Sequence, residues 1–305
     1  MRRIGLFLML ASALAQPGKN PFAGRWDITV TTPRDTYPDW LEVVDKDGKL
    51  EVRMQPRGGT VHPVSEVKMV ESHLLLTVSA GGRKGPATLW DLTMQGSDKL
   101  VGVQTSGDHN TARLAGVRAA ALNRPAPKAW SDPEPIFNGK DLTGWEPIGN
   151  NSHWVVEDGT MVNQSKGANV KTTRQFDDFK LHIEFNCPPG GNSGIYLRGR
   201  YEVQVEYETP AEDPFHAMGS IYGFLAPAVE LPRKPGEWET FDITLIGRTV
   251  TVIRDRVKTI DNQEIAGITG GALDAHEAEP GPFVLQGDHT GGMKYRNITV
   301  SVGKR

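Results

Sequence analysis

The sequence predicts an all-β protein made of two units, and three features of the chain indicate this. Short runs in which apolar and polar residues alternate recur along its 305 residues, and no stretch has the periodicity of an amphipathic helix. Its 34 glycines and 21 prolines favour many turns. An alanine- and proline-rich linker, residues 119–134, separates two groups of these runs, and it resists both helix formation and sheet pairing.

Composition indicates an ordinary globular protein. Apolar residues make up 38% of the chain and charged residues 23%. The formal net charge of -3 gives no reason to expect nucleic acid or an anionic membrane as a partner. After the first residues, no stretch is long and apolar enough for a transmembrane segment.

Residues 1–15 read as a secretory signal peptide. Arg2 and Arg3 form a short basic start, and the apolar run from Ile4 to Leu14 is too short to span a bilayer. The run ends in a small-x-small cleavage pattern, so the mature chain is expected to begin near Gln16. The alternative is a short N-terminal core helix.

A single cysteine, Cys187, excludes an intrachain disulfide. An exported protein without disulfides is compatible with a bacterial periplasm, so we expect a periplasmic or extracellular location. We expect Cys187 to be a buried, inert thiol, since no basic partner is evident near it in the sequence.

The first unit, residues 22–118, is a meander of short strands. Polar turns separate alternating runs and no helix is indicated, which predicts a small antiparallel β-barrel or half-barrel. The runs are Trp26–Thr31, Trp40–Val44, Leu50–Met54, Val67–Val70, His73–Val78, Ala87–Met94, Leu100–Thr105 and Ala112–Val117.

The second unit, residues 135–304, has about ten short strands and no helical signal, which predicts a two-sheet antiparallel sandwich or jelly roll. A hairpin with an Asp-Gly turn occupies Trp154–Val162, and Phe179–Phe185 alternates as a half-buried strand should. Glu208–Pro235 is a long insertion with five prolines, and loops of this length are often functional.

Residues 191–206 predict a hairpin with a turn near Gly199, around which the second unit is organised. Alternation sends four apolar residues to a core, namely Ile195, Leu197, Val203 and Val205. The opposite face then carries Tyr196, Arg198, Glu202, Gln204 and Glu206. A ring, a guanidinium, carboxylates and an amide on one face are what a polar, ring-shaped ligand such as a sugar needs. The alternative is a salt-bridged outer face.

Eight segments in order carry a resemblance to a known family. They are residues 137–145, 154–159, 192–198, 201–205, 219–223, 235–238, 284–286 and 294–298. With them the second unit resembles the 3-keto-disaccharide hydrolase domain family, a former domain of unknown function. The resemblance implies a concanavalin- or laminin-G-like jelly roll, and a glycosidase that cleaves a glycosidic bond next to a C3 ketone in carbohydrate metabolism. One departure is that Glu206 stands where members of the family often carry an aspartate.

The chemistry that the resemblance implies needs a base, a cation and an aromatic floor. A C3 ketone acidifies the C2 hydrogen, a base removes it, the C1 substituent leaves, and water adds back. We expect Glu202 to be the base and Arg198 to stabilise the enolate, with Asn192 and Gln204 binding sugar hydroxyls. The alternatives are an ion pair between Glu202 and Arg198, and a turn-capping role for Asn192.

His289 is the expected proton donor to the leaving oxygen, although a loop histidine without a role is an open alternative. Tyr222 and Trp238 are expected to stack on the sugar, against the alternative that Trp238 plugs the core. The other expected substrate-binding residues are Tyr196, Glu206, Gln286 and Asp288.

The sequence requires no cofactor. A divalent cation, such as calcium, shared by Glu202, Glu206 and Asp288 stays open. Two functions also stay open for the expected carbohydrate ligand: an exported hydrolase or lyase acting on 3-keto-glycosides, and a non-catalytic carbohydrate-binding module in the same fold.

Overall fold

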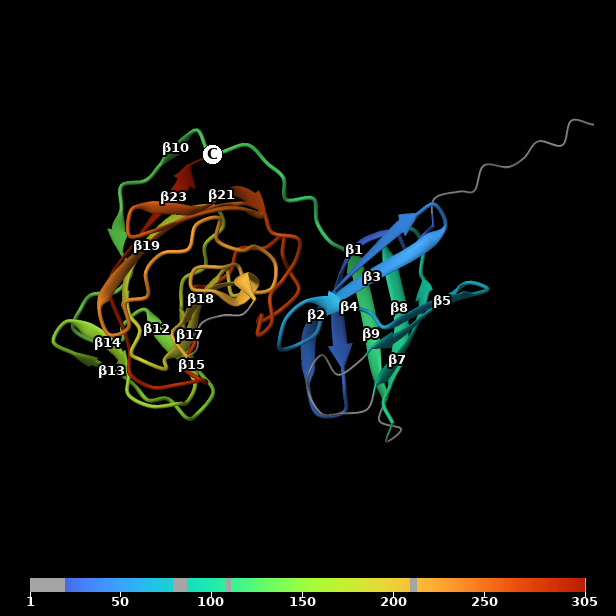
Figure 1. Cartoon of the computed structure of the whole chain (residues 1–305), viewed down its shortest axis with the longest axis horizontal. Coiled ribbons are helices and arrows are strands. Elements are labelled where there is room, and N and C mark those ends of the chain that lie inside the picture. Colours follow the sequence, from blue (N-terminus) through green and yellow to red (C-terminus); the bar gives the residue numbers. More distant parts are fainter. Residues whose placement is uncertain (1–19, 79–86, 108–110, 209–212, 305) are drawn as a thin grey trace, which may run out of the picture.

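The structure, a computed structural model, describes residues 20–78, 87–107, 111–208 and 213–304. The expected signal peptide, residues 1–15, lies outside them. The described chain folds almost entirely into strands, with one turn of 3-10 helix at Pro214–His216. None of its helices has the length and apolar character needed to cross a membrane. Figure 1 shows a body of blue to teal strands beside a larger body of green to red strands, joined by one connecting segment.

The first unit is one antiparallel sheet that curls into a half-barrel, as the sequence predicts. Its strand order is β4-β3-β2-β1-β9-β8-β7-β6-β5, so the first and last strands, β1 and β9, pair at the centre of the sheet. The consecutive strands β4 and β5 form the two edges. Alternate side chains pack inside the curl, among them Trp26 and Trp90, which are almost fully buried. The strands are β1 (Gly24–Thr31), β2 (Thr36–Lys46), β3 (Lys49–Gln55), β4 (His62–Pro63), β5 (Glu66–Val70), β6 (His73–Val78), β7 (Thr88–Met94), β8 (Lys99–Thr105) and β9 (Thr111–Arg118).

The second unit is the predicted all-β jelly-roll sandwich of two antiparallel sheets. The smaller sheet has the order β12-β15-β22-β17-β18: β12 (Trp145–Ile148), β15 (Asn169–Thr172), β22 (Val284–Leu285), β17 (Asn192–Leu197) and β18 (Tyr201–Glu206). The larger sheet has the order β13-β14-β23-β16-β19-β20-β21: β13 (Trp154–Glu157), β14 (Thr160–Asn163), β23 (Met293–Lys304), β16 (Phe179–Asn186), β19 (Trp238–Ile246), β20 (Thr249–Arg254) and β21 (Val257–Glu264).

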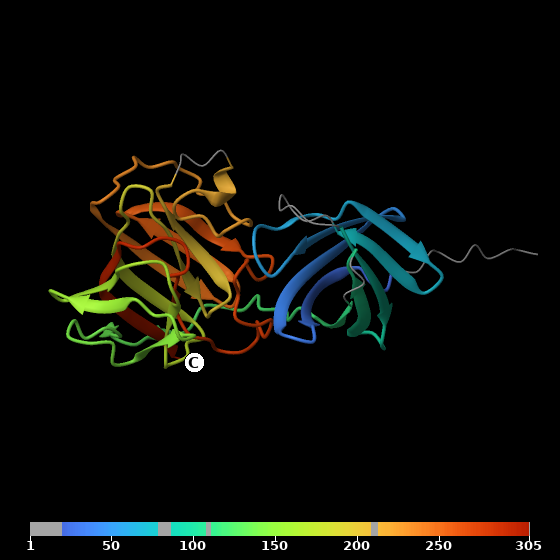
Figure 2. The same cartoon turned by 90° about the horizontal axis from the view of Figure 1, so that it is seen from below.

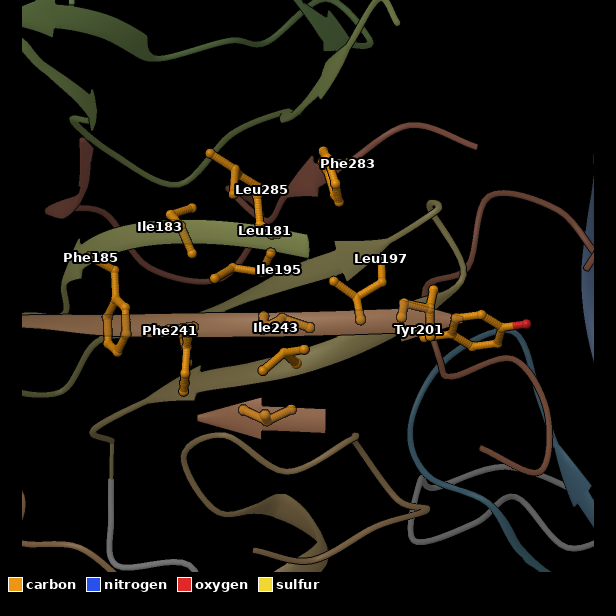
Figure 3. Close-up of a cluster of buried hydrophobic side chains, with 14 of the residues drawn as sticks. Leu181, Ile183, Phe185, Ile195, Leu197, Tyr201, Phe241, Ile243, Phe283 and Leu285 are labelled. Atoms are coloured by element: carbon orange, nitrogen blue, oxygen red, sulfur yellow. The ribbon is translucent and has the colours of Figure 1, made fainter. Parts of the chain in front are cut away.

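The core of the second unit lies between these sheets (Figure 3). Ile195 and Leu197 point into it from β17, as alternation predicts. Phe185 and Phe241 extend from the larger sheet, and their rings stack with centroids 4.6 Å apart. Burying each such side chain contributes about 1.5–3 kcal/mol. This apolar packing fixes the register of the β17–β18 hairpin, because a slip by one residue would turn its polar side chains inward.

The linker departs from the prediction at its C-terminal end. We expected residues 119–134 to resist sheet pairing, but Ala129–Trp130 forms β10 and Glu134–Pro135 forms β11, and both pair with β23. Both strands are only two residues long, and Pro133 lies between them. The last part of the linker therefore joins the larger sheet of the second unit.

The two units make direct contact. Trp40 of β2 is fully buried in the core cluster of the second unit, where its ring meets Phe224 edge-on at 5.5 Å between centroids. Arg25 pairs with Glu264 at 2.6 Å. Both views show the blue strands of the first unit approaching orange loops of the second (Figures 1 and 2). This contact brings the connection between β3 and β4 to the outer face of the β17–β18 hairpin.

Candidate functional site

A cavity of about 340 Å³ lies on the outer face of the β17–β18 hairpin, where the first unit meets it. Its size falls within the range of small-molecule sites. Four loops and the hairpin build its walls, and most lining residues are polar or glycine: Arg57, Gly58, Gly59, Asn192, Tyr196, Glu202, Gln204, Tyr222, Gly270, Gly271, Gln286, Asp288 and His289. The structure thus brings together eight of the residues that the sequence singles out.

The hairpin register places the central side chains. Tyr196 lies directly opposite Glu202, and Gly194 lies opposite Gln204. Gly194 carries no side chain on the cavity face, and the Glu202 carboxyl occupies the space beside it. A Cβ at Gly194 would lie 2.1 Å from Glu202 Oε1. The glycine therefore makes room for the carboxyl at the floor of the cavity.

Glu202 is almost fully buried, and this burial dominates its ionisation. Desolvation raises the pKa of Glu202 to about 8, while the hydrogen bond with Tyr196 and the charge of His289 act in the opposite direction. At neutral pH most of this carboxyl is therefore protonated in the free protein. Such a group is a neutral acid that becomes a strong base when its proton leaves.

Tyr196 ties the hairpin to two neighbouring loops. Its hydroxyl donates a hydrogen bond to the Gly270 carbonyl oxygen at 2.9 Å and lies 3.5 Å from Gln286 Nε2. Complete burial is the first cause that raises the pKa of Tyr196 well above its ordinary value. The ring is therefore a neutral, fixed wall rather than a proton carrier at neutral pH.

His289 and Asp288 form a dyad on the loop that follows β22. His289 Nδ1 lies 2.8 Å from Asp288 Oδ1, and this hydrogen bond is the main cause that raises the pKa of His289. The His289 side chain is 47% exposed, so solvent or a leaving group can reach its ring. Glu202 and His289 each favour the charged form of the other.

Asn192, Gln204 and Tyr222 also line the cavity, as expected. Asn192 Nδ2 donates to Glu208 Oε2 at 3.1 Å, and the Asn192 backbone N–H donates to Thr290 Oγ1 at 2.7 Å. Tyr222 comes from the long insertion, and its ring stacks on His216 with centroids 4.6 Å apart. The insertion thus contributes an aromatic wall.

Arg198 does not line the cavity, which corrects the role expected for it. Alternation stops at Leu197, because Arg198 and Gly199 adopt φ values of 52° and 67° in the hairpin turn. The Arg198 side chain is fully buried, and its Nη2 donates to the Gly247 carbonyl oxygen at 2.7 Å. Arg198 Nη1 lies 3.5 Å from Asp177 Oδ1, and within the described part of the chain Arg198 forms no ion pair with Glu202, so the expected alternative fails as well.

Glu206 and Trp238 also lie outside this cavity. Glu206 lines a separate cavity of about 260 Å³ with residues of the long insertion. Trp238 begins β19 of the larger sheet, and the Arg296 guanidinium covers its ring at 3.9 Å. Neither residue lines the cavity that holds Glu202.

The expected cation site is not assembled by these residues. Glu206 faces a different cavity from Glu202 and Asp288. Within the described ranges, no three His, Cys, Asp or Glu side chains are grouped so that they could hold a metal ion. The three carboxylates therefore do not fit a shared calcium ion, and no step below passes through one.

Sequence reasoning missed the glycine-rich lining and Arg57. Gly58 and Gly59 belong to the first unit, and Gly270 and Gly271 follow β21 in the second unit. Their glycine pairs signal turns, but nothing local indicates that two turns about 200 residues apart meet at one cavity. Only the contact between the units reveals this wall.

Comparisons with known proteins match the second unit of the chain. Residues 132–301 match the model of the 3-keto-alpha-glucoside-1,2-lyase-like domain family. A 3-keto-disaccharide hydrolase of Bacteroides thetaiotaomicron is 28% identical over 154 residues, which cover 38% of this chain and 53% of that protein. The chain thus spans about half the length of this curated relative.

Solved structures of two candidate glycosyl hydrolases from Parabacteroides distasonis are also similar. One is 31% identical, covers 59% of this chain and 94% of its own, and superposes with a TM-score of 0.48. The other is 20% identical, covers 55% of this chain and 92% of its own, and has a TM-score of 0.47. The family match covers more than half of the 305 residues and confirms the resemblance drawn from the sequence. The chain therefore belongs to the 3-keto-alpha-glucoside-1,2-lyase-like domain family.

Proposed function

We propose that the chain is an exported enzyme that cleaves the glycosidic bond of 3-keto-glycosides, such as 3-keto-disaccharides, by elimination followed by addition of water. Family membership and the relatives indicate a carbohydrate-active protein of the glycosyl hydrolase kind. The finer reaction rests on the name of the Bacteroides thetaiotaomicron relative and on the chemistry of the cavity. Export rests on the sequence of residues 1–15 alone.

The observation that carries this proposal is the pairing of Glu202 and His289 in one sugar-sized cavity. Burial raises the pKa of Glu202 to about 8, and Asp288 raises the pKa of His289. Groups with pKa values shifted in this way can give and accept protons near neutral pH. An elimination needs one group of each kind.

In the proposed reaction the ionised Glu202 removes the proton from C2 of the sugar. The C2–H electron pair forms the enolate with the C3 ketone, and this enolate expels the oxygen at C1 to leave a C1–C2 double bond. Protonated His289 gives its proton to the departing oxygen. Water then adds its hydroxyl to C1 and a proton to C2, which restores the 3-keto sugar and completes a net hydrolysis.

The remaining cavity residues orient the ring. Gln204, Asn192 and Gln286 offer amide donors and acceptors that suit sugar hydroxyls. The rings of Tyr196 and Tyr222 offer apolar faces of the kind that pack on a sugar. Holding the C2 hydrogen beside Glu202 converts the proton transfer into an intramolecular step.

The test is incubation of the purified chain with a 3-keto-disaccharide in deuterated water. We expect release of both sugars, with deuterium at C2 of the 3-keto product, because elimination removes that hydrogen and hydration replaces it from solvent. Glu202→Gln is expected to abolish the release, since glutamine cannot accept the proton. Release without deuterium at C2 would instead indicate direct displacement at C1, which normally uses two carboxyl groups.

The alternative function is a carbohydrate-binding module without catalysis. It predicts that calorimetry detects binding of an intact sugar while no product forms over long incubation. Glu202→Gln would then change affinity only slightly. Loss of product formation in Glu202→Gln with retained sugar binding distinguishes the enzyme from the module.

A further inference from the structure

We propose that the first unit contributes a substrate-binding residue to the cavity: Arg57 binds the sugar with its guanidinium, and the loop that carries it forms one wall of the site. This loop, residues 56–61, connects β3 and β4. The inference rests on the function proposed above and extends it to a part of the chain outside residues 132–301, which match the family model.

The loop is held in a defined shape by bonds within the first unit and across to the second. Gln55 Nε2 donates to the carbonyl oxygens of Pro56 at 2.8 Å and Gly59 at 2.9 Å. The Gly271 backbone N–H of the second unit donates to the Arg57 carbonyl oxygen at 2.9 Å. These bonds fix the backbone on both sides of the Arg57 side chain.

Glycines of the second unit allow the loop to approach closely. A Cβ at Gly270 would lie 2.3 Å from the Gly59 carbonyl oxygen, and a Cβ at Gly223 would lie 2.4 Å from Thr60 Oγ1. Gly223 also has a φ of 73°, which disfavours any side chain there. The loop and the second unit therefore fit together because Gly223 and Gly270 carry no side chain. The loop packs directly against the walls of the cavity.

The Arg57 guanidinium is oriented but still accessible. It pairs with Asp35 and lies over the ring of Tyr37, 4.9 Å from the centroid. The side chain is nevertheless 60% exposed and lines the cavity. A guanidinium has five N–H donors, more than one carboxylate can accept, so it can bind a ligand oxygen without leaving Asp35.

The reaction needs the charge that Arg57 carries. Negative charge develops on the C3 oxygen when C2 loses its proton, and a fixed cation stabilises it. Arg198, the residue expected from the sequence, lies buried outside the cavity. Of the cavity-lining residues that the structure describes, Arg57 is the one lysine or arginine. Arg57 therefore takes the enolate-stabilising role that the sequence analysis expects of Arg198.

The test compares Arg57→Gln and Arg57→Lys with the wild-type chain in steady-state cleavage of a 3-keto-disaccharide. Arg113→Gln is the matched control, because Arg113 is an exposed arginine on β9 of the same unit and does not line the cavity. We expect Arg57→Gln to lower kcat/KM roughly tenfold to a hundredfold, because this is the effect of losing one hydrogen bond from a charged group. Arg57→Lys should recover part of the loss, and Arg113→Gln should show none.

Two results would overturn the inference in different ways. Wild-type turnover combined with equal kcat/KM in Arg57→Gln and Arg113→Gln would exclude Arg57 from the site and leave the proposed function intact. Absence of both turnover and sugar binding in the wild-type chain would refute the proposed function, and the role of Arg57 with it. The thermal unfolding midpoint of each variant is measured as a control, so that only equally folded proteins are compared.

Discussion

Gly194→Ala is the substitution that tests the geometry of the cavity most directly. The added Cβ would lie 2.1 Å from Glu202 Oε1 and 2.8 Å from Glu202 Cδ, both far inside normal contact distance. The carboxyl must therefore move by about 1 Å or more, and a misplacement of that size can cost about a hundredfold in rate. We expect kcat/KM for a 3-keto-disaccharide to fall about a hundredfold. Overpacking of this kind also destabilises a fold by about 1–3 kcal/mol.

Ile195→Val is the matched control for that substitution. Ile195 is the next residue on β17 and is fully buried on the opposite face, in the core. Removing one methylene there costs about 0.5–1.5 kcal/mol and does not touch the cavity. Denaturant unfolding measures the stability of both variants, and initial rates measure their activity. If Gly194→Ala kept the kcat/KM of the Ile195→Val control, the Glu202 carboxyl would not be the group that acts on the substrate.

Three further predictions follow from burial and charge. Because the pKa of Glu202 is raised from 4.5 to about 8 by folding, its stabilising contribution is present below about pH 4.5 and is lost as the pH rises toward 8. Glu202→Gln should therefore gain thermal stability relative to the wild type as the pH is raised from 5 to 8, and parallel melting curves would contradict the buried-acid assignment. Asp288→Asn removes the main cause that raises the pKa of His289, so the pH profile of kcat/KM should move to lower pH; an unmoved profile would show that the dyad does not act in catalysis. Burial raises the pKa of Cys187 to about 12, so the native protein should resist iodoacetamide at pH 8, and rapid labelling would show that this thiol is accessible.

The strand pattern of the sequence predicts the architecture and much of the site. Alternation along residues 191–206 places Ile195 in the core and Tyr196, Glu202 and Gln204 on one outer face, because a strand constrained by a core can present its side chains in only one register. Gln286 is also expected in the site, and the structure brings it to the hairpin, where its backbone N–H donates to the Gly194 carbonyl oxygen at 2.9 Å. Local periodicity therefore identifies those site residues that regular strands position.

The errors arise where local periodicity ends or where distant segments meet. Arg198 follows the last alternating residue, and its positive φ turns the side chain into the protein instead of the cavity. Trp238 lies on β19, which belongs to the larger sheet, and local sequence does not specify to which sheet a strand belongs. Arg57 lies in a different unit altogether. Its place in the cavity depends on glycines of the second unit such as Gly270, which has no side chain that would collide with the loop. This requirement is visible only in the contact between the two units.

The contact between the units places a loop of the first unit in the wall of the cavity that holds Glu202. Desolvation is the largest cause of the raised pKa of Glu202, and Gly58 and Gly59 of this loop line the same cavity. The same loop carries Arg57, whose charge, in the proposed reaction, offsets the negative charge that forms on the sugar during proton removal. Burial alone would strengthen Glu202 as a base but leave it rarely ionised, and a cation alone would favour ionisation but weaken the base. In the proposed reaction, a buried carboxyl and a loop that places a cation in the same cavity combine a strong base with a stabilised product of proton transfer. Through that loop, a sheet outside the matched family region would take part in the chemistry.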